Sequence, residues 1–360
     1  MKIFSCICTN TIFFENSLCL QCGRVLGYLP DHGVMSTLDP EDALWRALTP
    51  DTGGRYRMCV NRSAEDVCNW MVPETDAHDA CRSCRLNHII PNLTTPGNRM
   101  LWYRIEGAKR RLLYSLDTMR LPIVGREADP EHGLAFEFLE SQEEGGEFRD
   151  SVGASGEVMI GHHKGLITIN LAEADPVLRE RMRERMREAY RTLLGHFRHE
   201  IGHYYWDRLV SNTAWHEPFR ELFGDETTDY PSALKRHYQV GVPEGWHENH
   251  ISAYASAHPW EDWAETWAHY MHMVDTLETA HAYAFIENDL PSIPNTLERA
   301  NFDVLAAKWH HLTQGMNALN RSMGLPDAYP FVMHGRAEQK VRFVHQVVSA
   351  QQRTTSDPPA

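Results

Sequence analysis

The chain has 360 residues, of which 42 % are apolar and 10 % aromatic, and its formal net charge is −14. This composition is typical of a globular protein and excludes an intrinsically disordered one. The negative charge argues against a protein that depends on gripping nucleic-acid phosphates. The sequence offers no run of about 18 apolar residues that would predict a membrane-spanning helix. Its first residues lack the apolar core of a signal peptide, so we expect a cytoplasmic protein.

The distribution of cysteine divides the chain, because all eight cysteines precede residue 85. We expect an N-terminal domain over residues 1–95, ending in a linker at 91–97 that is rich in turn-forming residues. A second domain is expected over residues 96–350, followed by a disordered tail at 351–360.

The cysteines form two clusters of four, and each cluster contains one CxxC pair. The first cluster is Cys6, Cys8, Cys19 and Cys22, and the second is Cys59, Cys68, Cys81 and Cys84. Four thiolates complete a closed tetrahedron around Zn²⁺ and leave no open coordination position. We therefore expect two structural zinc ions that stabilise the fold. Disulfides, which a reducing cytosol disfavours, unpaired core thiols and iron are the alternatives.

In chain order, the next element is a helix over residues 99–119, where apolar residues recur at helical spacing. Residues 98–120 contain six basic and two acidic side chains. We interpret this excess as a solvated helix face, since charged runs usually are. Two extended segments follow at 134–139 and 158–171, and the second shows the alternation of a half-buried strand.

A long helix is predicted to begin at Asp175 and Pro176, an N-cap followed by proline at the first helical position. Apolar residues at helical spacing continue it to about Leu209. Further helices are expected at 260–275, 296–323 and 336–350 after a loop-rich insert. This order of strands and helices predicts an α+β fold with a small sheet and a long active-site helix.

His199, Glu200 and His203 form an HExxH pattern late on that helix. Residues four apart lie on one helix face, so both imidazoles can reach one metal ion. Glu200 would lie beside the metal and could take a proton from the bound water. Gly202 would allow another segment to approach closely.

A catalytic zinc needs a third protein ligand and an open position for water. The best source is the aromatic segment 260–270, in which Glu261 and Glu265 lie four apart on one face. Two buried carboxylates need a metal, cations or hydrogen bonds to offset their desolvation. Zinc could satisfy one, and the NH of a metal-bound imidazole could satisfy the other. Spacing alone permits either glutamate as the ligand, with His258 or His269 as further alternatives.

The HExxH pattern followed by Glu261-x2-Ala264-Glu265 resembles the gluzincin metallopeptidases, which include thermolysin and, more closely, anthrax lethal factor. This resemblance implies that Glu261 is the third zinc ligand and that Glu265 supports a histidine ligand. In the lethal-factor group a catalytic tyrosine precedes the ligand glutamate by seven residues, which corresponds to Tyr254 here. An ordinary packed tyrosine is the alternative. The segment between the two patterns is longer than in thermolysin, and the resemblance does not account for it.

Over its whole length the chain is similar to the bacterial zinc-binding metallopeptidases with an N-terminal zinc ribbon. The shared features are the clustered cysteines and the segments at 165–170, 197–205 and 263–270. The resemblance implies hydrolysis of a peptide or protein substrate with one catalytic and two structural zinc ions. In this mechanism Glu200 moves a proton from water to the leaving amine, and Tyr254 stabilises the oxyanion. The strand at 167–171 would hold the substrate by strand addition.

A different class of function is a zinc-ribbon adaptor that binds nucleic acid or protein, including an SprT-like DNA-associated protease. The net charge and the glutamate-type third ligand argue against it. His162 and His163 could line a substrate cleft, but the chain has 21 histidines and we favour surface positions for both. The tryptophans near the motifs are expected in the core: Trp206, Trp260, Trp263 and Trp267.

Overall fold

The N-terminal part of the chain is built mainly from strands in the computed structural model, which describes residues 2–140, 160–186, 188–286 and 301–356. The strands are β1 (Phe4–Ser5), β2 (Thr11–Ile12), β3 (Val25–Leu29), β4 (Val34–Glu41), β5 (Leu44–Ala47), β6 (Arg55–Met58) and β7 (Met71–Pro73). Strands β3 to β7 form one antiparallel sheet in sequence order, and β1 pairs with β2. The helical turns α1 (Val60–Ser63) and η1 (Cys84–Leu86) flank the second cysteine cluster. No strand of this region was predicted from the sequence, because all of them except β4 are short.

A second sheet of four strands has the order β10-β11-β9-β8. Its strands are β8 (Asn87–Ile89), β9 (Ala135–Leu139), β10 (Gly161–His163) and β11 (Leu166–Asn170). The two predicted extended segments are confirmed as β9 and as β10 with β11, while residues 158 and 159 lie outside the described residues. Strand β8 pairs in parallel with β9, so the hydrogen bonding of this sheet crosses the expected boundary at residue 95.

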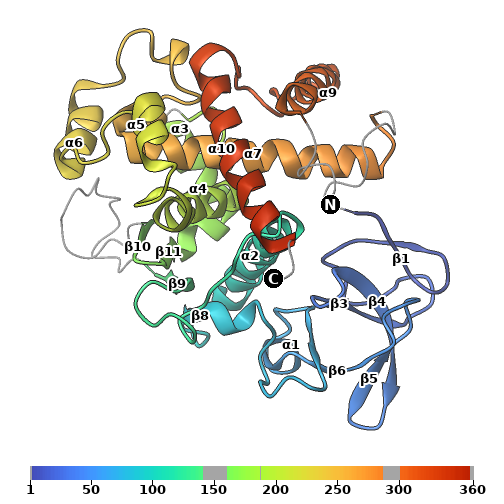
Figure 1. Ribbon diagram of the computed structural model, residues 1–360. Helices are drawn as coiled ribbons and strands as arrows, with labels where there is room; N and C mark the ends of the chain where they lie inside the picture. Colours follow the sequence, from blue (N-terminus) through green and yellow to red (C-terminus); the bar gives the residue numbers. More distant parts are fainter. Residues whose placement is uncertain (1, 141–159, 187, 287–300, 357–360) are drawn as a thin grey trace.

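Helix α2 (Asn98–Thr118) confirms the first predicted helix and stands between the N-terminal strands and the rest of the molecule (Figure 1). Its Tyr114 ring contacts Phe14 on one side, with ring centroids 5.4 Å apart. The interpretation of the basic residues at 98–120 as a solvated face holds for Arg99, Arg104 and Arg120, which are exposed, and is wrong for two others. Lys109 and Arg110 are buried, because Lys109 donates to Glu106 and Arg110 donates to the backbone carbonyl of Val67.

The predicted long helix is interrupted. Helix α3 (Pro176–Arg185) starts as predicted, with the Asp175 side chain accepting from the backbone NH of Val177, but a new helix α4 (Leu193–Tyr205) begins at Thr192. The Thr192 hydroxyl caps α4 by accepting from Gly195. Arg191 turns away to pair with Glu173 at 2.6 Å. The Thr192 cap and the Arg191–Glu173 ion pair therefore end the helical conformation between α3 and α4, although apolar residues continue at helical spacing there.

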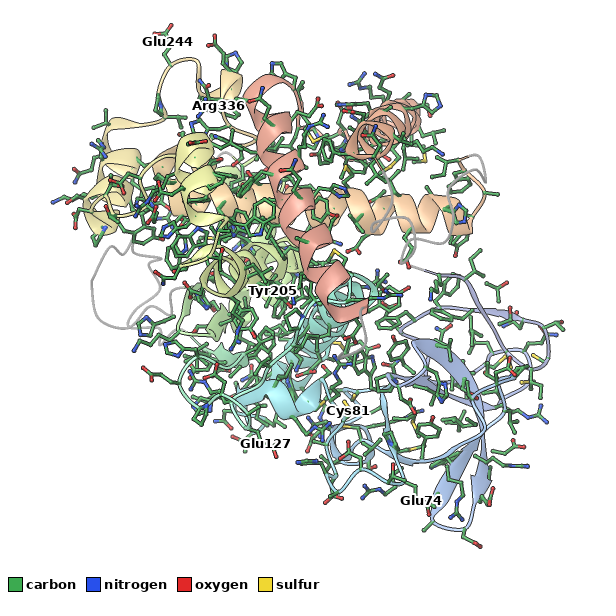
Figure 2. The ribbon with its side chains drawn as sticks, in the orientation of Figure 1. Glu74, Cys81, Glu127, Tyr205, Glu244 and Arg336 are labelled. Carbon is green, nitrogen blue, oxygen red and sulfur yellow. The ribbon has the colours of Figure 1, made fainter. Side chains whose placement is uncertain are left out.

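Helix α7 (Pro259–Ala282) crosses α4 closely at Gly202 and runs through the centre of the fold (Figure 1). The Trp263 indole donates to the Gly202 carbonyl at 2.8 Å, and the Trp267 ring stacks on Tyr205, which is labelled in Figure 2, at 4.9 Å. The core positions expected for Trp206, Trp263 and Trp267 are confirmed, whereas Trp260 is half-buried against His203.

The insert between α4 and α7 contains more helix than expected. It holds α5 (His216–Phe223), α6 (Tyr230–Val240), η4 (Trp246–Glu248) and η5 (Tyr254–Ala257). The short π-helical turn η3 (Trp206–Val210) continues α4 and confirms the predicted helix end near Leu209. The chain ends in α9 (Phe302–Ser322) and α10 (Gly335–Ser356), which crosses α7 (Figure 1). Helix α10 extends into the segment expected to be a disordered tail, while residues 296–300 and 357–360 lie outside the described residues. None of the described helices is long and apolar enough to cross a membrane.

The contact between α4 and α7 predicts the effect of enlarging Gly202. A Cβ atom there would lie 3.1 Å from the Ala264 Cα and 3.2 Å from the Trp267 Cβ. We expect Gly202→Ala to lower the free energy of unfolding, because overpacking costs about 1–3 kcal/mol and outweighs a gain of about 1 kcal/mol in helix propensity. Gly107→Ala in α2 is the matched control, since a Cβ there meets nothing within 4 Å. Denaturant unfolding of both variants tests this, and a Gly202→Ala protein at least as stable as the control would contradict it.

Candidate metal centres

Helix α4 brings His199 and His203 together at one site. Their imidazole rings lie 5.0 Å apart, and the spacing of four residues places both on one helix face. Glu200 follows His199 and is also buried. Burial raises the pKa of the Glu200 carboxyl, so this group binds a proton more readily than an exposed glutamate does.

Helix α7 supplies Glu261 to the same site. Its Oε2 atom lies 2.9 Å from Nε2 of His199 and 3.7 Å from Nε2 of His203. The shorter contact lacks hydrogen-bond geometry, so Oε2 is buried without a donor. Burial alone would raise the pKa of Glu261, but the imidazoles of His203 and His199 hold it well below its usual range. The site therefore contains an ionised carboxylate with one unsatisfied oxygen between two imidazoles.

This donor set fits a zinc ion. The three side chains each offer one ligand atom, and these atoms lie within 4.8 Å of one another. Zinc takes imidazole nitrogen and carboxylate oxygen, and three protein ligands leave a fourth position open. A cation at this point would satisfy the buried Oε2 atom of Glu261, which the described residues leave without a hydrogen bond.

Glu265 lies behind His199 and outside the ligand set. Its Oε1 atom is 2.8 Å from Nδ1 of His199, and its Oε2 atom accepts from the Ser252 hydroxyl at 2.6 Å. This contact fixes the ring so that Nε2 faces Glu261, an arrangement common for metal-bound histidines. The other proposed ligands are engaged elsewhere: His258 caps α7 by accepting from Trp260, and His269 bonds the Tyr329 hydroxyl.

Two contacts of the candidate site were not predicted from the sequence. Ser252 supports Glu265, and Tyr230, the first residue of α6, donates a hydrogen bond to Oε1 of Glu261. Both come from the insert, where no motif marks them. Tyr254 lies near the site with its ring 5.9 Å from His199, but among the described residues its hydroxyl makes no hydrogen bond to Glu261 or Glu200.

The surface position favoured for His162 was wrong. Its ring stacks against His203 with centroids 6.2 Å apart, because β10 lies beside α4, and it also contacts Trp260. His163, the next residue on the strand, points the other way and is exposed, as expected. The strand expected to hold substrate, β11, is paired on both sides. The outer strands of this sheet among the described residues are β10 and β8, and β10 is the one that contacts α4.

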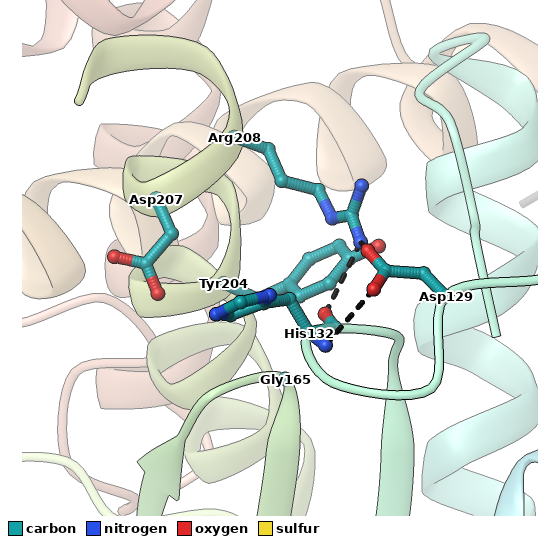
Figure 3. A pocket seen from close by; sticks show the side chains of 6 residues that line it. All are labelled: Asp129, His132, Gly165, Tyr204, Asp207 and Arg208. Atoms are coloured by element: carbon teal, nitrogen blue, oxygen red, sulfur yellow. Dashed lines mark hydrogen bonds and ion pairs between the residues drawn. The ribbon is translucent and has the colours of Figure 1, made fainter. Parts of the chain in front are cut away.

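A cavity of about 150 Å³ lies one turn beyond His203 and is lined by Asp129, His132, Gly165, Tyr204, Asp207 and Arg208. Figure 3 shows Arg208 directed towards Asp129, to which it donates at 2.6 Å, while Asp207 points away from that pair. None of the three convergent ligands lines this cavity. It therefore adjoins the site and is not the site itself.

The cysteines converge in the two expected groups. Cys6, Cys8, Cys19 and Cys22 form one, and Cys59, Cys68, Cys81 and Cys84 form the other, each with its sulfur atoms within 4.8 Å of one another. All eight are free thiols. Tetrahedral thiolate sites of this kind suit zinc.

The second cysteine group contacts the rest of the molecule through α2, near Cys81 as labelled in Figure 2. Arg110 of α2 is buried beside it, and although burial opposes its charge, the Cys68 thiolate and Glu106 raise its pKa. Four thiolates around one zinc ion carry a net charge of about −2. Arg110 therefore compensates the charge of this centre from the neighbouring domain.

These centres are those of a zinc-binding protein that combines a cysteine-rich module with a second metal site of the metallopeptidase kind. The chain belongs to the family described as "Putative zinc-binding metallo-peptidase", whose model matches residues 98–347, and residues 3–95 match a zinc-ribbon domain. Proteins of Mycobacterium tuberculosis (strain H37Rv) and Mycobacterium bovis, both named only as uncharacterized proteins, are 42 % identical over 355 residues, which covers 97 % of this chain and 95 % of theirs. No solved structure matches the chain significantly.

The different contacts of the two glutamates predict different effects on zinc binding. Glu261→Ala removes a ligand atom and should nearly abolish binding at the α4–α7 site. Glu265→Ala removes only the support of His199 and should bind zinc about 10- to 100-fold more weakly. Competitive zinc titration of both variants measures this difference. The reverse ranking would make Glu265 the ligand.

The contact with Arg110 predicts that the two cysteine centres differ in their effect on stability. Cys81→Ser and Cys19→Ser should each lose one zinc ion from a total of about three per chain. Cys81→Ser should also destabilise the second domain more than Cys19→Ser does, because it removes part of the counter-charge of the buried Arg110, whose other partner Glu106 lies 3.7 Å away. Metal analysis with thermal unfolding tests this, and equal destabilisation by the two substitutions would refute it.

Proposed function

We propose that this chain is a zinc-dependent peptidase with a gluzincin-type site, in which His199, His203 and Glu261 hold the catalytic zinc. The observation that carries this proposal is the buried Glu200 carboxylate beside three convergent ligand atoms. The position of Glu265 behind His199 supports the gluzincin type, in which an acid supports a histidine ligand. When bound, zinc supplies a Lewis acid that polarises a carbonyl and lowers the pKa of water.

Glu200 performs the proton transfers in this proposal. No hydrogen bond or ion pair ties its carboxylate to another described residue, so both oxygens are available to water and substrate. Its raised pKa suits a group that accepts a proton from the attacking water and passes it to the leaving amine. A strongly acidic carboxylate would be a weaker base for the first of these transfers.

The substrate chain is held along β10 in this proposal. An outer strand can pair with an extended peptide, which gives sequence-independent binding through backbone hydrogen bonds. His162 on β10 accepts from the Gly165 NH through Nε2, so its neutral ring carries the proton on Nδ1. That Nδ1 atom is buried without an acceptor, next to His203. The peptide would therefore be bound through the backbone of β10.

The adaptor function receives no comparable support. Its strongest sequence signal was the basic run on α2, but Lys109 and Arg110 are buried and Arg111 pairs with Glu15 at 2.5 Å. These charges serve internal contacts. Eight free thiols at two zinc centres also suit the reducing cytoplasm that we expected for the protein.

The experiment that tests the proposed function compares the wild-type chain with Glu200→Gln. This substitution preserves size and removes the base, so the variant should keep its full zinc content and lose cleavage of a peptide library by about 10²- to 10⁴-fold. His203→Ala is the control that loses the metal of this site. Cleavage by Glu200→Gln at the wild-type rate would refute the proposal, as would a zinc-loaded wild-type protein that cleaves no member of the library.

A further inference from the structure

We propose that Tyr230 is a positioning residue for the catalytic metal, because its phenol holds Glu261 so that a single carboxylate oxygen faces the ion. This inference rests on the proposed zinc site and adds a residue from outside both sequence patterns. The inference is based on the different contacts of the two carboxylate oxygens of Glu261. Oε1 accepts a hydrogen bond from the Tyr230 hydroxyl, and Oε2 lies between the two imidazoles.

Because Glu261 is buried, its hydrogen bond with Tyr230 should affect how the carboxylate binds a metal ion. The side chain is only 1 % exposed, so water cannot satisfy Oε1 if the phenol is removed. A carboxylate with both oxygens free can rotate and bind an ion through the two of them. Such binding would fill the open position that a catalytic zinc needs for water and substrate. The Tyr230 hydroxyl prevents this by keeping Oε1 engaged.

Tyr230 is itself held in place by its surroundings. It begins α6, where the Asp229 side chain caps the helix by accepting from Ser232 at 3.0 Å. Its ring packs edge-on against His258 and Trp260, at 5.1 and 5.8 Å between centroids. Trp260 immediately precedes Glu261 and His258 caps α7, so the start of α6 packs against the start of α7 beside the carboxylate.

Tyr254 is the natural comparison, since the family resemblance assigns the functional phenol to that position. Its ring lies 5.9 Å from His199 and 5.8 Å from His237, and no hydrogen bond joins it to Glu261. The geometry therefore assigns control of the carboxylate to Tyr230. Because Tyr254 makes no hydrogen bond to the ligand glutamate, its substitution should leave the metal site intact.

The test measures zinc affinity and cobalt spectra of Tyr230→Phe in the full-length protein, with Tyr254→Phe as the matched control. Each substitution removes one hydroxyl and keeps the ring. Tyr230→Phe should weaken zinc binding at the catalytic site by about 10- to 100-fold in competitive titration, as loss of a ligand's support does. Tyr254→Phe should bind zinc as the wild type does. His203→Ala, which retains only the cysteine centres, supplies the baseline.

Cobalt substituted at the catalytic site reports coordination through its visible absorption, which weakens when a fifth ligand is added. The Tyr230→Phe spectrum should change in this direction, and the Tyr254→Phe spectrum should match the wild type. Unchanged affinity and spectrum in Tyr230→Phe would overturn the inference, as would a larger loss of affinity in Tyr254→Phe. These readouts do not require peptide cleavage, so they separate a failure of this inference from a failure of the proposed function.

Discussion

The close crossing of α4 and α7 is the constraint on which the candidate site depends. The two histidines lie on α4 and the two glutamates on α7, and the helices approach at Gly202, where a side chain would meet the backbone of Ala264. The indole of Trp263 fixes the crossing by donating to the Gly202 carbonyl. A wider separation would carry Glu261 away from both imidazoles, since its Oε2 atom now lies 2.9 and 3.7 Å from them.

Two buried ion pairs lie close to this crossing. Lys340 of α10 pairs with Asp262, the residue after Glu261. Arg198, the residue before His199, pairs with Asp275 of α7. Burying an unpaired charge would cost several kcal/mol, so each pair fixes the relative position of two elements. On one side of the site α10 is tied to α7, and on the other α7 is tied to α4. The ligands themselves are therefore attached to elements with little freedom to move.

The two metal-binding parts of the chain are physically joined. Strand β8 lies in the sequence of the zinc-ribbon match and pairs with β9 of the metallopeptidase match. Arg110 of α2 donates to the backbone carbonyl of Val67, the residue before Cys68, and α2 also packs on α4. The second cysteine group is therefore linked through α2 to α4, the helix that carries His199 and His203. The first group has its contacts within the N-terminal sheet, for example from the Thr37 hydroxyl to Cys6.

Much of the site followed from the sequence because its spacing is local. His199 and His203 meet through a single helical turn, and the cysteine pairs with two residues between them meet through tight turns. The α+β class and the positions of most helices also followed from apolar periodicity. The family model agrees with the zinc-binding metallopeptidase class that these patterns indicated.

Tertiary structure decided what no local pattern encodes. Glu261 and Glu265 lie four residues apart on one face of α7, so the sequence does not distinguish them. The crossing at Gly202 places Glu261 between the two imidazoles and Glu265 against Nδ1 of His199. His162 looked like one of many surface histidines until β10 packed beside α4. Tyr230 carries no motif at all, because its role arises when α6 folds back onto the start of α7. A sequence fixes contacts one turn apart through backbone geometry, whereas contacts across an insert depend on how whole elements pack.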